Sequence, residues 1–127
     1  MEKAKLSVTS VEEKKLPSNL EAEQSLIGSV LVNNDIIDEI SNIVNAGKFF
    51  DPIHRKIYEV IENLNNKGMI ANPITLKNYF ENDSGLVDVG GVDYLVKLTR
   101  FSSSIKQSVD YAKIIHEMYV KRELIFI

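Results

Sequence analysis

The chain has 127 residues, a net charge of −3 and no cysteine, with 44% hydrophobic and 26% charged residues. This length allows one domain with a modest core plus a tail, and the lack of cysteine excludes a disulfide framework or a thiolate metal site. The acidic balance argues against a domain that binds nucleic acid by itself, because phosphate binding normally goes with a basic excess.

The N-terminal residues resemble neither a signal peptide nor a membrane helix. Residues 1–16 are polar, with only isolated apolar residues, and predict a disordered tail. No apolar run in the chain reaches the roughly 18 residues that a membrane helix needs. We therefore expect a cytoplasmic protein that does not bind membranes.

The first helix is predicted over residues 19–33. Ser18 and Glu21 have the spacing of a capping box, and apolar residues then recur on one helical face. Gly28 lies among these apolar residues, where glycine costs about 1 kcal/mol relative to alanine. We interpret Gly28 as a place where another helix backbone approaches closely, and the alternative is a tolerated defect.

Three further helices are marked by residues at their ends. The second follows Asn33-Asn34 and stops near Gly47. Asp51-Pro52 and Asn72-Pro73 each place a capping side chain before a proline in the first helical turn. These two dipeptides predict the starts of the third and fourth helices.

The region before the last helix is predicted to hold a turn and one short helix. Asn82–Gly85 has the composition of a turn. Gly90-Gly91 precedes a short helix that ends near Leu98, and Ser102–Ser104 is a break or cap. Since no segment alternates with the period of a strand, the predicted fold class is all-α. We expect a compact bundle of about six helices that ends in a long C-terminal helix.

The last predicted helix begins near residue 105 and carries two apolar stripes. A helix of about 22 residues is about 33 Å long, more than the head of residues 17–104 is expected to cover. Its distal part should therefore pack on a partner helix or another subunit, and the alternative is a core helix with a frayed end. The first stripe is Ile105, Val109, Ala112, Ile115 and Tyr119, and the second, a candidate self-association surface, is Tyr111, Ile114, Met118 and Ile125.

Sequence motifs for nucleotide hydrolysis, zinc catalysis and serine hydrolysis are absent. Phe49 follows Gly47-Lys48 where a phosphate-binding loop needs serine or threonine. His116-Glu117 begins a zinc-protease pattern, but Val120 occupies the position of the second histidine. No G-x-S-x-G nucleophile elbow occurs. His54, the other histidine, is predicted to be a capping or partly buried polar group.

Five segments follow the motifs of one known family, in the same order and at the same spacing. They are Leu16 to Gly28; Phe49-Phe50 with His54-Arg55 and Ile57-Tyr58; Ile74-Thr75-Leu76; Val89-Gly90-Gly91 with Tyr94-Leu95; and Tyr111-Ala112, Ile114-Ile115 and Arg122-Glu123-Leu124. Together they resemble the N-terminal domain of the DnaB-type bacterial replicative helicase family over about residues 16–124. Lys48 is a departure, because the family often has an acidic residue there.

The resemblance implies a parent enzyme that unwinds duplex DNA at the replication fork with ATP, as a homohexameric ring. Its N-terminal domains would form a collar, often a trimer of dimers, that binds the C-terminal region of primase and in some bacteria a loader. This chain would have no enzymatic activity or cofactor of its own, because ATP and Mg²⁺ bind in a RecA-like domain, and only the full ring would contact DNA. Glu21 and Tyr94 match positions implicated in primase coupling, and residues 105–127 match the first, here truncated, helix of a hairpin that packs on a neighbouring subunit.

Other interpretations of the sequence stay open. The chain could be a free-standing helical adaptor or regulatory domain, although apolar residues at 124–127 would then be left uncovered. It could also be a helical nucleic-acid-binding domain, which the net charge disfavours. Glu21 has an alternative role in the capping box, and Tyr94 has one as a core residue.

Overall fold

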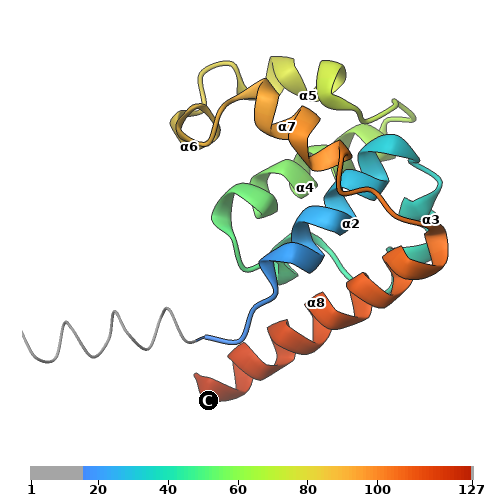
Figure 1. Cartoon of the computed structure of the whole chain (residues 1–127), viewed down its shortest axis with the longest axis vertical. Helices are drawn as coiled ribbons and strands as arrows, with labels where there is room; N and C mark the ends of the chain where they lie inside the picture. Colours follow the sequence, from blue (N-terminus) through green and yellow to red (C-terminus); the bar gives the residue numbers. More distant parts are fainter. Residues whose placement is uncertain (1–15, 127) are drawn as a thin grey trace, which may run out of the picture.

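The computed structural model describes residues 16–126, and this part of the chain is entirely helical (Figure 1). It contains seven α-helices and one short 3₁₀-helix, with no strand among the described residues. The all-α prediction is therefore confirmed, while the predicted tail lies outside the described residues except for Leu16. The elements are α2 (Leu20–Val32), α3 (Ile36–Ile40), η1 (Ala46–Lys48), α4 (Pro52–Asn66), α5 (Pro73–Phe80), α6 (Ser84–Asp88), α7 (Val92–Thr99) and α8 (Ile105–Ile125).

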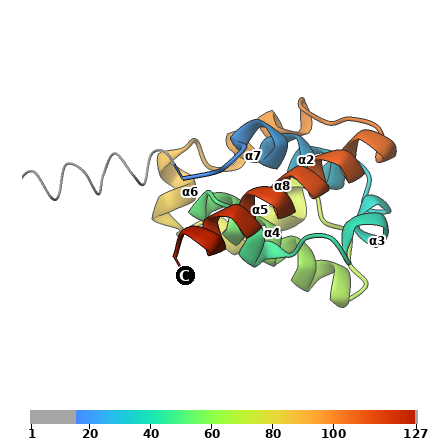
Figure 2. The ribbon, with the colours of Figure 1, turned by 90° about the horizontal axis from the view of Figure 1, so that it is seen from below.

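Helix α2 forms the centre of the domain. It packs against α8 on one side and against α7 and α4 on others, and α5 in turn packs on α4 and α7 (Figure 1). Leu26, Ile27 and Val30 of α2 are completely buried. Burial of each such side chain contributes about 1.5–3 kcal/mol to folding. Figure 2, seen from below, shows α8 crossing the near face of this bundle along most of its length.

At Gly28, the backbones of α2 and α7 approach each other closely. A β-carbon built on Gly28 would overlap the carbonyl oxygen of Leu98 and lie 2.8 Å from its carbonyl carbon. Leu98 belongs to α7, so the obstacle is helix backbone rather than a flexible side chain. The interpretation of Gly28 as a site of close helix approach is confirmed.

The predicted caps of α4, α5 and α8 are confirmed, but the cap of α2 is wrong. Asn19, not Ser18, caps α2, because its side-chain oxygen accepts the amide hydrogen of Ala22 at 3.0 Å. Glu21 then falls in the second helical position and cannot complete a capping box. The capping box of this fold is formed instead by Asn72 and Thr75 at the start of α5.

Two elements between the predicted helices also differ from the sequence-based prediction. The second helix ends at Ile40, and the chain continues through turns into η1, where the Glu62 carboxylate accepts the amide hydrogen of Ala46. Asn82–Gly85, predicted as a turn, overlaps the five-residue helix α6, which begins at Ser84. The Asp83 side chain caps that helix by accepting the amide hydrogen of Leu86 at 3.1 Å. This extra helix accounts for seven helices in place of six.

The head, residues 17–104, covers more of α8 than was predicted from the length of this helix. Ala112 and Ile115 are buried, and Arg122, near the end of the helix, is still only 9% exposed. The chain before α2 and the η1–α4 connection extend the head along α8, which explains the additional cover. None of the described helices is both long enough and apolar enough to cross a membrane.

Candidate docking surface

Glu21 and Tyr94, the two partner-binding positions predicted from the family resemblance, lie on α2 and α7, two helices that pack against each other. Glu21 is exposed in the first turn of α2, and Tyr94 of α7 is half-buried against the core. Gln24 lies one turn after Glu21 on α2, and its Nε2 is 3.5 Å from the Tyr94 hydroxyl. Because side chains three residues apart on a helix are neighbours, Glu21 and Tyr94 border the same patch.

A buried carboxylate supports this surface from below. Glu23 and His54 are each only 1% exposed. Glu23 Oε2 accepts the amide hydrogen of Phe50 at 2.7 Å, and Oε1 accepts those of Asp51 at 3.3 Å and His54 Nδ1 at 2.8 Å. One side chain of α2 therefore holds the η1–α4 connection and the first turn of α4 in place. His54 is fully buried and does not cap the helix, in contrast to the prediction.

The same histidine links the buried carboxylate to Tyr94. His54 Nε2 lies 2.7 Å from the Tyr94 hydroxyl, and the two rings are nearly parallel, with interplanar angle 9°. Since Nδ1 donates to Glu23, the second nitrogen of a neutral ring accepts the hydroxyl hydrogen. Burial raises the pKa of Tyr94, so this hydroxyl stays protonated and able to donate to a higher pH than an exposed tyrosine would. The position of the Tyr94 ring is thus set by a continuous series of hydrogen bonds that runs from Glu23 through His54.

Arg122 anchors α8 to the head. Its Nη1 donates to the carbonyl oxygen of Pro17 and its Nη2 to that of Lys48, each at 2.8 Å. The guanidinium also lies 5.2 Å from the centre of the Phe50 ring. Burial lowers the pKa of Arg122, and the negative charge of Glu23 acts in the opposite direction. The end of α8 is therefore joined to the segment that Glu23 also holds.

Lys48 adds a second tie between η1 and α8. Its Nζ donates to the carbonyl oxygen of Ile43 at 2.9 Å and lies 3.0 Å from His116 Nδ1. It also lies 5.8 Å from the centre of the Tyr119 ring. The acidic side chain that the resemblance leads one to expect at this position could not donate these hydrogen bonds. The departure at Lys48 therefore has a specific structural role in this chain.

The four residues of the predicted self-association stripe do not share one environment. Tyr111 and Ile114 pack partly against the core of the same chain, and Met118 is half-buried. Only Ile125 is strongly exposed, with 55% of its surface accessible. It continues into Phe126, which is 73% exposed, and follows Leu124, which is 64% exposed. The free apolar surface of α8 is thus concentrated at its C-terminal end.

The sequence-based prediction missed Glu23 and Arg122, although both lie on apolar stripes. Glu23 precedes Leu26 and Ile27 by three and four residues, so its carboxylate shares their buried face. Arg122 follows Tyr119 by three residues on the first stripe of α8. A charged residue in register with a buried face is the signal that could have identified both.

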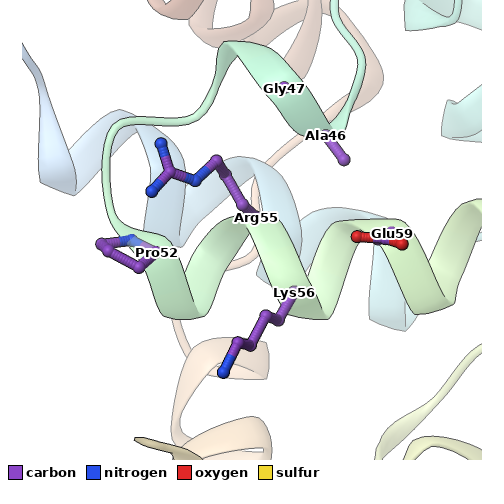
Figure 3. Close-up of a pocket in the computed structure, with 6 residues that line it drawn as sticks. All are labelled: Ala46, Gly47, Pro52, Arg55, Lys56 and Glu59. Atoms are coloured by element: carbon purple, nitrogen blue, oxygen red, sulfur yellow. The ribbon is translucent and has the colours of Figure 1, made fainter.

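A hollow beside η1 shows no geometry for holding a phosphate. It measures about 260 Å³ and is lined by Ala46, Gly47, Pro52, Arg55, Lys56 and Glu59. Figure 3 shows Arg55 and Lys56 leaving α4 in different directions. Lys56 is instead paired with Asp83 at 3.2 Å. Within residues 16–126, no group of three or more histidine or acidic side chains is arranged to hold a metal ion.

Comparison with known proteins gives consistent matches in sequence. The family model described as the DnaB-like helicase N terminal domain matches residues 15–117. The replicative DNA helicase DnaB of Rickettsia felis is 44% identical over 110 residues, which cover 87% of this chain and 22% of that protein. The DnaB helicase of Pasteurella multocida is 35% identical over 109 residues, covering 86% of this chain and 23% of that protein. The chain thus spans less than a quarter of these relatives.

The fold comparison agrees with the sequence matches. The crystal structure of the N-terminal domain of DnaB helicase from Mycobacterium tuberculosis superposes with a TM-score of 0.79 at 29% sequence identity. The superposition covers 87% of this chain and 80% of that one. The long final helix is part of the all-helical fold described above. The chain belongs to the family of DnaB-like helicase N-terminal domains.

Proposed function

We propose that this domain assembles the ring of a replicative helicase and docks the C-terminal region of primase at the replication fork. The parent helicase would unwind duplex DNA with ATP in the cytoplasm. ATP and Mg²⁺ would bind in another domain, and DNA would be contacted by the complete ring. A loader protein could use the same collar in some bacteria. The proposal rests on the family membership together with two exposed features of this chain, the end of α8 and the α2–α7 surface.

The observation that carries the assembly role is the apolar end of α8. Beyond the anchor at Arg122, three successive side chains, Leu124, Ile125 and Phe126, are 64%, 55% and 73% exposed. Three adjacent apolar side chains on the surface of a soluble domain are typical of an interface. A second copy of the domain that packs on these three side chains would bury this surface. The resulting dimer would be the unit from which a collar is built.

Ile125→Asp is expected to weaken self-association of the domain. The substituted side chain is 55% exposed and makes no core contact, so the fold should be retained. Placing a charge in an apolar interface should raise the dimer dissociation constant by about tenfold or more. Sedimentation equilibrium over a concentration series measures this change. Val32→Asp on α2, at a position 61% exposed, is the matched control and should leave the association unchanged.

Tyr94→Ala is expected to weaken binding of the primase C-terminal region by about tenfold, which is typical of an aromatic residue at an interface. Calorimetric titration measures the affinity, and circular dichroism checks that the variant is folded. Phe101→Ala removes another aromatic ring, 41% exposed, and should bind as the parent chain does. Unchanged affinity in folded Tyr94→Ala would remove Tyr94 from the docking surface.

A further inference from the structure

A hollow of about 370 Å³, here called the α8 hollow, lies where the end of α8, the start of α4 and the chain before α2 meet. Phe126 borders it and also belongs to the apolar end of α8, where this side chain is 73% exposed. The apolar surface that is proposed to join two copies therefore continues into the α8 hollow. The apolar residues that line it are Leu16, Phe50, Pro52 and Phe126, and the charged ones are Arg55, Arg122 and Glu123.

Two of the three charged side chains in the α8 hollow are available to a partner. Arg122 is only 9% exposed and already donates to two backbone carbonyl oxygens. Arg55 and Glu123 are both exposed and carry opposite charges. Among the described residues, neither of them forms an ion pair within its own chain. Arg55 also borders the hollow beside η1 (Figure 3), so its side chain lies between the two hollows.

A surface with one available cation and one available anion is complementary to itself. In a dimer with a two-fold axis, both copies use the same surface and every contact occurs twice. Arg55 of each copy can then pair with Glu123 of the other, over apolar side chains that both copies contribute. A partner with a uniformly acidic or uniformly basic surface would face a like charge at one of these two positions, which disfavours binding. The charges of the α8 hollow thus favour a second copy as its occupant.

We propose that a second copy of this domain docks in the α8 hollow about a two-fold axis, with Arg55 of each copy paired to Glu123 of the other. This inference rests on the proposed function, in which the end of α8 joins copies of the domain. It adds the residues that orient the two copies. The apolar side chains supply most of the affinity, and the two ion pairs select the orientation in which opposite charges meet.

The test reverses one charge at a time in the full chain. Arg55→Glu and Glu123→Arg each replace two attractive contacts of the dimer by two repulsive ones, so each should raise the dimer dissociation constant by about tenfold or more. An equimolar mixture of the two variants should associate about as tightly as the parent chain. In the mixed pair one copy carries two carboxylates and the other two guanidinium groups, so both contacts are attractive again. Sedimentation equilibrium measures the three dissociation constants.

The mixture separates a contact between copies from a contact within one copy. If Arg55 and Glu123 act only within their own chain, the mixture stays as dissociated as the single variants, and the proposal is wrong. Glu39→Arg on α3 reverses another exposed carboxylate outside the α8 hollow and should leave the association unchanged. Circular dichroism checks that every variant is folded.

The same measurements distinguish this inference from the proposed function on which it rests. If Ile125→Asp dissociates a dimer that neither charge reversal affects, assembly through the end of α8 stands, and only the pairing of Arg55 with Glu123 is wrong. A parent chain that stays monomeric over the whole concentration series would overturn both. Loss of association in each single variant, with recovery in their mixture, is the result that the α8 hollow predicts.

Discussion

Gly28→Ala is expected to destabilise the domain by about 2 kcal/mol, although alanine is the better helix former. Alanine gains about 1 kcal/mol of helix propensity over glycine. Its β-carbon, however, would overlap the carbonyl oxygen of Leu98 and lie 2.8 Å from the carbonyl carbon. Relief of that overlap requires α7 to move away from α2, and overpacking of this kind costs about 1–3 kcal/mol and sometimes more. The steric term therefore exceeds the gain in propensity.

Urea unfolding followed by circular dichroism measures this effect. Gly47→Ala is the control, because the nearest atom to its β-carbon would be the Asn45 Oδ1 at 3.3 Å, at the end of an exposed side chain. The control should change the unfolding free energy by less than about 1 kcal/mol. Equal or higher stability of Gly28→Ala would mean that α7 can retreat from α2 without loss of packing. Because α7 carries Tyr94, the proposed docking of primase predicts that this variant binds primase less tightly.

The helices that were predicted correctly are those whose ends carry local chemical signals. Asp51-Pro52 and Asn72-Pro73 start α4 and α5 where predicted, and Ser104 caps α8 by accepting the Gln107 amide hydrogen. The start of α2 was misplaced because Ser18 and Asn19 are both good capping residues and adjacent in sequence. The choice between them depends on how the chain enters the bundle. Helix α6, with five residues, is too short for a periodic pattern.

The residues that hold the candidate docking surface in place could be predicted only in part from the sequence. Glu23 and Arg122 lie on buried faces, so the sequence contains a signal that they are unusual. Their partners are backbone groups of residues 17, 48, 50 and 51, in connections placed by tertiary packing. A polar group in a loop has no periodic pattern, and its partner cannot be found from spacing alone. Glu21 and Tyr94 came from the family resemblance, and the structure adds that Gln24, one helical turn after Glu21, lies beside Tyr94.

Glu23→Ala is expected to destabilise the domain by about 4 kcal/mol, as much as a large truncation in the core. The substitution leaves three buried or partly buried donors without an acceptor, the amides of Phe50 and Asp51 and the His54 Nδ1. Each unsatisfied donor costs about 1–3 kcal/mol. The Arg122 guanidinium also loses the carboxylate that most raises its pKa. Chemical unfolding of the variant measures the total.

Two comparisons separate this network from a general effect of losing a carboxylate. Glu21→Ala removes an exposed glutamate two positions earlier on α2 and should change stability by less than about 0.5 kcal/mol. Tyr94→Phe removes only the Tyr94 hydroxyl, which lies 2.7 Å from His54 Nε2 at the end of the hydrogen-bonded series that begins at Glu23. If the hydrogen bonds from Glu23 through His54 to Tyr94 act as a unit, the two substitutions should not be additive. The double variant Glu23→Ala/Tyr94→Phe should then lose less stability than the two single variants lose together, by about 0.5 kcal/mol or more. If the two losses of stability are strictly additive, the role of Glu23 is limited to holding residues 50–54. If Glu23→Ala loses no more stability than Glu21→Ala does, water replaces the carboxylate.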